Sequence, residues 1–142
     1  MAVVNFKGAL RSYLLADAAI IALVGQRIYS PVAPQGVTKP YLIIQKIGKQ
    51  ERLKTTTALS GVVMERWQID AYSDDSDQCE ALAKAVCDGL DLKYDENWSG
   101  YKIYLSEWEN ENNLSESEIE GSETMSNRIQ QDFSIKRSYE KT

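Results

Sequence analysis

The sequence predicts an α+β domain in which helices cover one face of an antiparallel sheet of about four strands. Two patterns indicate this class: apolar residues recur at helical spacing in some segments, and polar and apolar residues alternate in others. The length of 142 residues, with 43% hydrophobic and 26% charged residues, is typical of one globular domain. We therefore expect a single domain over residues 1–142.

Two helices are expected near the N-terminus. The apolar stripe of the first consists of Phe6, Leu10, Tyr13 and Leu14. Asn5 is placed to cap this helix, because its side chain can accept a hydrogen bond from a free backbone N–H. Asp17 is the expected N-cap of a second helix that ends at Val24, with Gly25 just beyond it.

An ordered connector and two strands follow. Arg27–Tyr29 is a short extended piece, and the prolines of the chain, all within residues 31–40, predict a kinked connector. Strands are expected over Tyr41–Ile47 and Val62–Tyr72. Glu65 interrupts the apolar face of the second strand, so we expect the start of that strand to lie near an open edge of the sheet.

The clearest helix is predicted over Asp74–Leu92, where serine and aspartate residues favour the first turn. The last two strands are expected over Tyr101–Trp108 and Arg128–Tyr139, each with one apolar and one polar face. The predicted core combines apolar positions of the helices and strands: Phe6, Leu10, Leu14, Trp67, Ile69, Leu82, Val86, Leu90, Phe133 and Ile135.

Charge is divided unevenly along the chain. Residues 1–56 carry eight Lys or Arg and two acidic residues, whereas residues 57–142 carry eight basic and nineteen acidic residues. Residues 106–127 hold seven glutamates and no basic residue, and we expect a mobile acidic loop at about residues 107–125. One interpretation is that this loop docks on a basic partner surface, and the other is that it only aids solubility.

Candidate contact residues follow from this division. The acidic candidates are Glu107, Glu109, Glu111, Glu116, Glu118, Glu120 and Glu123, and the basic candidates are Lys46, Lys49, Arg52 and Lys54. On a strand, the spacing of Glu107, Glu109 and Glu111 places three charges on one face. Trp98, in a polar turn, is the candidate for an exposed aromatic anchor.

The sequence lacks the residues that several kinds of catalytic or binding site require. The chain has no histidine, no glycine-rich phosphate loop and no nucleophile elbow, so we expect no enzyme and no cofactor. The glutamates do not follow the pattern of a calcium loop, and a basic protein surface fits them better than a metal ion. Cys79 and Cys87 lie too far apart on one helix to form a disulfide. No apolar stretch approaches the length of a membrane span, and the N-terminus lacks a signal-peptide pattern.

The chain resembles the tail-completion family of long-tailed bacteriophages and prophages, whose members are also called tail-terminator or head-to-tail joining proteins. The residues that carry the resemblance are Leu14–Asp17, Ala22–Tyr29, Val32–Gly36, Pro40–Tyr41, Trp67–Ser73, Cys79–Val86 and Gln131–Phe133. No single segment is diagnostic; their order and spacing carry the likeness.

The resemblance implies a non-enzymatic virion assembly protein that forms a ring of six subunits, caps the tail tube and joins tail to head. Its implied partners are further copies of itself, the major tail tube protein and a connector or stopper protein of the head neck. DNA would pass through the ring without specific binding, and no membrane is involved. The implied location is the tail–head junction of the virion, after assembly in the host cytoplasm. A different class remains open: a small acidic adaptor or nucleic-acid mimic that binds a host protein.

Overall fold

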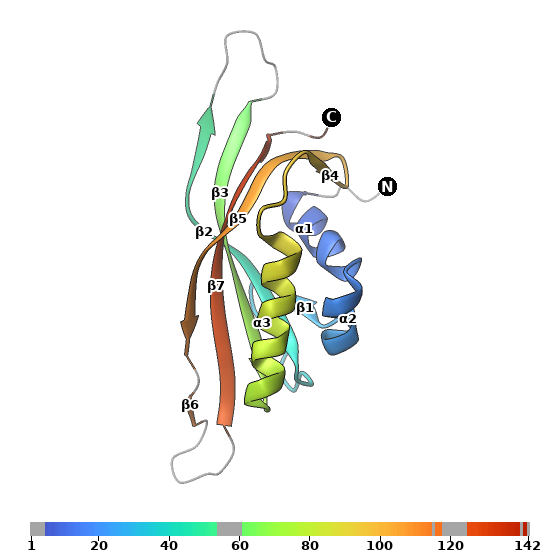
Figure 1. The fold of residues 1–142 in the computed structure, drawn as a ribbon, viewed down its shortest axis with the longest axis vertical. Helices are drawn as coiled ribbons and strands as arrows, with labels where there is room; N and C mark the ends of the chain where they lie inside the picture. Colours follow the sequence, from blue (N-terminus) through green and yellow to red (C-terminus); the bar gives the residue numbers. More distant parts are fainter. Residues whose placement is uncertain (1–4, 54–60, 115, 118–124, 140, 142) are drawn as a thin grey trace.

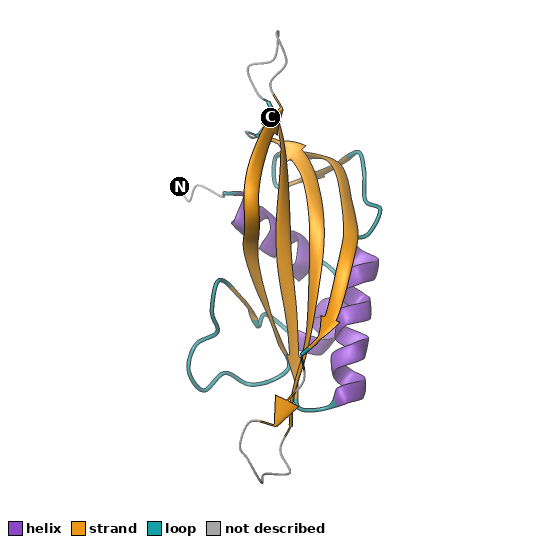
Figure 2. Ribbon diagram, turned by 90° about the vertical axis from the view of Figure 1, so that its left-hand side faces the viewer, coloured by secondary structure: helices purple, strands orange, loops and turns teal. Residues whose placement is uncertain are grey.

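The structure is a computed structural model that describes residues 5–53, 61–114, 116–117, 125–139 and 141. In this part of the chain, three helices lie on one face of a curled, half-barrel sheet, and the opposite face carries no helix (Figures 1 and 2). The elements are α1 (Phe6–Leu15), α2 (Ala18–Val24), β1 (Ile28–Tyr29), β2 (Tyr41–Leu53), β3 (Val62–Ser73), α3 (Ser76–Leu90), β4 (Glu96–Trp98), β5 (Tyr101–Asn113), β6 (Glu116–Ser117) and β7 (Met125–Ser138).

The sheet is mixed rather than antiparallel throughout. Within the described residues its strand order is β1-β2-β3-β7-β5-β4, and β6 pairs with β7 alone. β1 lies parallel to β2, and the other pairs are antiparallel. The expected sheet of about four antiparallel strands is therefore wrong, although the class is broadly α+β. The prediction missed β4 because a strand of three residues is too short to show an alternating pattern, whereas β1 lies within Arg27–Tyr29, which was expected to be extended.

The ends of the helices are fixed by side chains close in sequence. Asn5 Oδ1 accepts a hydrogen bond from Gly8 N at 2.8 Å, which caps α1. Asp17 caps α2 in the same way, through the N–H of Ala19 at 2.9 Å. α3 begins at Ser76, with Asp75 as its N-cap. The expected starts of α1 and α2 agree with the structure, and α3 is two residues shorter at each end than expected.

One glycine sets how closely two helices approach. A Cβ at Gly89, in the last turn of α3, would lie 2.9 Å from Asp17 Oδ2 and 3.8 Å from Ile20 Cδ1. The start of α2 can pack here because this position of α3 has no side chain.

The core lies between the helices and the sheet. All ten residues predicted above for the core are buried, with relative exposures between 0% and 4%. Phe6 of α1 sits among aromatic rings, edge-on to Tyr101 with ring centroids 5.4 Å apart. None of the helices in the described ranges is both long and apolar enough to cross a membrane.

The long strands reach opposite ends of the molecule. At one end Leu53 of β2 pairs with Val62, and at the other end β5 continues to Asn113, opposite Ile129 of β7 (Figure 1). The loop expected from residue 107 is thus wrong over residues 107–113, which form the second half of β5. These residues contain almost no apolar positions, so the pattern did not reveal a strand whose pairing with β7 holds it. Residues 118–124 of the expected mobile loop lie outside the described residues.

Candidate functional site

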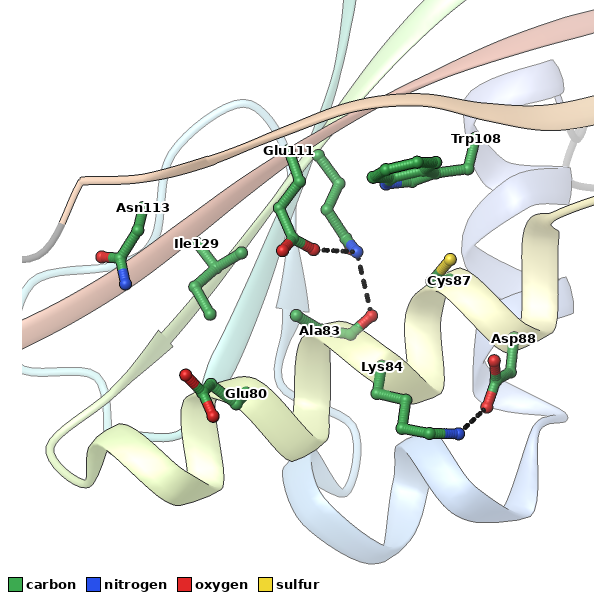
Figure 3. A pocket seen from close by; sticks show the side chains of 10 residues that line it. Glu80, Ala83, Lys84, Cys87, Asp88, Trp108, Glu111, Asn113 and Ile129 are labelled. Carbon is green, nitrogen blue, oxygen red and sulfur yellow. Dashed lines mark hydrogen bonds and ion pairs between the residues drawn. The ribbon is translucent and has the colours of Figure 1, made fainter.

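A groove between β5 and α3 lies at one border of the sheet (Figure 3). Its volume is about 360 Å³. Its floor is apolar and is lined by Ala83, Cys87, Trp108 and Ile129. Its rim is charged and is lined by Glu80, Lys84, Asp88 and Glu111. Trp108 is 40% exposed, an unusual fraction for a tryptophan beside a core. We refer to this feature as the β5–α3 groove.

The groove has a hydrogen-bonded polar wall and a net negative rim. Gln131 Nε2 of β7 donates to Glu111 Oε1 and to the backbone oxygen of Ala83, each at 3.0 Å, and so joins both sides of the groove. Lys84 Nζ contacts Asp88 Oδ2 at 2.6 Å, so the lysine that lines the groove among the described residues already has an acidic partner. Glu80 and Glu111 therefore leave the rim acidic.

The thiols near the groove are chemically quiet. Burial raises the pKa of the Cys79 thiol to about 11, and burial together with nearby carboxylates raises the pKa of Cys87. Because the thiolate is the nucleophilic form, neither cysteine is activated at neutral pH. Among the residues that the structure describes, no group of three or more His, Cys, Asp or Glu gathers to hold a metal ion.

The glutamates of β5 do not share one face. Register shifts interrupt the pairing of β5 with β7 between Ile103 and Leu105 and again between Trp108 and Asn110. Glu107 and Glu109 consequently lie on the helix-free face, where Glu109 Oε1 is 3.6 Å from Arg66 Nε. Glu111 points to the opposite side, toward α3 (Figure 3). The expectation of three charges on one face is wrong because the bulge adds a residue to the period of two.

The border of the sheet at β5 is partly open. β4 covers the first residues of β5, and Asp91 Oδ1 accepts a hydrogen bond from Trp108 N at 2.9 Å. From Glu109 to Asn112, no strand in the described part of the chain pairs with β5 on the side away from β7. We call this stretch the free β5 edge, and it borders the β5–α3 groove.

The opposite border of the sheet is open at β2. β1 pairs with β2 only at Leu42 and Ile43, and from Ile44 to Leu53 no described strand covers the side of β2 away from β3. We call this stretch the free β2 edge. Lys46 lies on it, with Nζ 3.4 Å from Glu65 Oε2.

The remaining candidate residues are placed as follows. Lys49 and Arg52 belong to β2 and Glu116 belongs to β6, but their side chains are not among those described. Lys54, Glu118, Glu120 and Glu123 lie outside the described residues.

Trp98 is not an exposed anchor. It is 3% exposed and stacks on Tyr13 with ring centroids 4.0 Å apart. Its Nε1 donates to Glu96 Oε1 at 2.9 Å. The polar sequence around Trp98 misled the prediction, because the short strand β4 turns the indole inward against α1.

A buried ion pair escaped the sequence analysis. Glu65 of β3 and Arg137 of β7 are 2% and 6% exposed, and Arg137 Nε donates to Glu65 Oε1 at 2.9 Å. The guanidinium also lies over the Phe6 ring, 4.3 Å from its centroid. The sequence did indicate this pair, because Glu65 and Arg137 each occupy an inward-facing position in a strand whose apolar and polar residues alternate. The expectation that Glu65 marks an open edge is wrong, because β3 lies between β2 and β7.

Comparisons with known proteins show a family and a similar fold. The model of the family described as "Tail completion protein gp17" matches residues 8–132. A chain in the structure of the virion of a native gene transfer agent particle has a similar fold, with a TM-score of 0.64 and 22% sequence identity. The alignment covers 93% of this chain and 96% of that chain. No curated protein matches the sequence significantly.

Proposed function

Because the chain belongs to the tail completion protein gp17 family, and is thus a phage structural and assembly protein, we propose that it forms a ring that caps the tail tube and joins the tail to the head. The chain would occupy the tail–head junction of the virion after assembly in the host cytoplasm. Its contacts would be with copies of itself, with the tail tube protein and with a connector or stopper protein of the head neck. The role is structural, without a chemical step.

The observation that carries this proposal is the placement of two unlike open borders on one sheet. The free β2 edge is basic in sequence, with Lys46, Lys49 and Arg52 on β2, and the free β5 edge is acidic. They lie on opposite borders of the sheet and extend toward opposite ends of the molecule (Figure 1). A closed ring of identical subunits needs two different surfaces on each subunit, because its contacts are heterologous.

The charge of the chain suits a channel for DNA. The net charge of −5 would give a ring of six subunits a charge of roughly −30, if every subunit is identical. Tight DNA binding needs Lys or Arg at the phosphates, and an acidic wall works against it. We therefore propose that the duplex passes through the ring without being held.

The proposal can be tested by removing the protein from an assembling phage. We expect full heads and finished tails that remain separate, and joined particles after the purified protein is added back to the mixed extract. The joined particles are counted by electron microscopy, and the same images show whether a ring is present at the end of the tail. Normal joining without the protein would refute the role. A one-to-one complex with a host DNA-binding protein, with no ring on tails, would support the acidic adaptor instead.

A further inference from the structure

We propose that the free β2 edge of one copy pairs with the free β5 edge of the next copy, so that the sheet continues from subunit to subunit across the β5–α3 groove. This inference rests on the ring proposed above and assigns its subunit contact. The occupant of the β5–α3 groove is therefore a second copy of this chain, and the docking element is strand β2.

The backbone supplies the first reason. An uncovered strand edge presents unpaired N–H and C=O groups that another strand can use. The free β2 edge runs from Ile44 to Leu53, and the free β5 edge runs from Glu109 to Asn112. One copy thus carries one edge on each border of its sheet, and neither edge can reach the other within the same copy.

Charge supplies the second reason. Along the free β2 edge, from Ile44 to Leu53, the sequence has three basic residues and one acidic residue. The free β5 edge carries Glu109 on the helix-free face, while Glu111 and Glu80 line the groove on the helix side. A basic strand added to β5 would meet carboxylates on both faces, and opposite charges on adjacent strands stabilise the pairing.

The register of the sheet supplies the direction and the offset. β2, β3, β7 and β5 pair antiparallel in that order, so β2 and β5 run in opposite directions. Lys46 of β2 pairs with Trp67 of β3, Trp67 pairs with Phe133 of β7, and Phe133 pairs with Trp108 of β5. Lys46 and Trp108 therefore lie at the same height along the strands. From this level the two free edges extend toward opposite ends. Neighbouring copies must therefore be offset along the strands, which a closed ring permits when the strands are inclined to the ring axis.

Two charge-reversal variants test the contact. In Lys49→Glu/Arg52→Glu the β2 edge becomes acidic, and in Glu80→Lys/Glu109→Lys the groove side becomes basic. Each variant alone would place like charges across every contact, and we expect its self-association to weaken about tenfold or more. An equimolar mixture restores opposite charges at every contact if the two variants alternate, so it should form rings with one-to-one composition.

The control is Lys102→Glu/Lys141→Glu, which changes the net charge by the same amount as Lys49→Glu/Arg52→Glu at two lysines that lie outside both free edges. We expect it to assemble like the parent and not to rescue Glu80→Lys/Glu109→Lys. Sedimentation velocity measures the oligomers, and circular dichroism verifies that each variant is folded. If Glu80→Lys/Glu109→Lys does not fold, Glu80→Lys alone serves in its place.

The outcomes separate this contact from the proposed ring. Rings that form equally well from each variant alone would overturn the pairing of β2 with β5 and leave the ring intact. Failure of the folded variants to assemble when mixed would also overturn the pairing. If the parent protein forms no ring at high concentration or on tails, the proposed function itself fails.

Discussion

Breaking the buried pair of Glu65 and Arg137 should destabilise the domain more than almost any exposed substitution. In Glu65→Leu the guanidinium of Arg137 stays buried at 6% exposure and loses the carboxylate that accepts from its Nε at 2.9 Å. Arg137 Nη1 would keep the backbone oxygen of Ser138 at 2.9 Å, which compensates only part of the charge. An uncompensated buried charge costs about 3–5 kcal/mol. For a domain of this size that corresponds to a fall in Tm of roughly 10–20 °C.

The measurement is a double-variant cycle in which urea unfolding of each variant is monitored by tryptophan fluorescence. Arg137→Leu should cost somewhat less than Glu65→Leu, because Glu65 would keep Lys46 Nζ at 3.4 Å from its Oε2. The combined variant should cost about 2 kcal/mol less than the sum of the two, because both members of the buried pair are then removed together. Arg66→Leu is the matched control. Its guanidinium is half exposed and lies 3.7 Å from Asp132 Oδ2, so its loss should cost less than about 1 kcal/mol. Additive costs in the cycle, or a Glu65→Leu variant as stable as the parent, would refute the reasoning.

Three further substitutions probe the packing and the helix-free face. Leu82→Ala should lower the free energy of unfolding by about 2–5 kcal/mol, because Leu82 is fully buried; an unchanged Tm would contradict the contact of α3 with the sheet. Tyr13→Phe should cost about 1 kcal/mol in urea unfolding through loss of the hydrogen bond that Tyr13 Oη donates to Gly89 O at 2.6 Å, and should abolish a tyrosine titration near its raised pKa of about 12. Burial raises the pKa of Asp70 above the ordinary value of 3.8. The ionised carboxylate therefore lowers the free energy of unfolding at a pH above the folded-state pKa, and this destabilisation is lost as the pH falls toward 3.8. Parent protein should therefore gain Tm relative to Asp70→Asn on acidification, and a constant difference would show that Asp70 does not titrate in this range.

The sequence predicted helix caps and core positions correctly, because these features depend on residues that are close together in the chain. Asn5 and Asp17 cap their helices because a side chain reaches backbone N–H groups two or three residues away. The core positions of α1, α3, β3 and β7 followed from periods that hold within one element. The likeness to tail-completion proteins rested on the same ordered segments.

The pairing of distant strands decided the rest. Residues 107–113 form a strand because β7 lies beside them, and a bulge then turns Glu111 toward α3 and leaves Glu109 on the other face. Trp98 is buried because β4 folds back onto α1. The sequence alone determined which segments are helical, which positions face the core and how charge divides along the chain. Only the tertiary structure decided which strand edges stay open and which charges meet, because hydrogen bonding between strands joins residues that no local pattern connects.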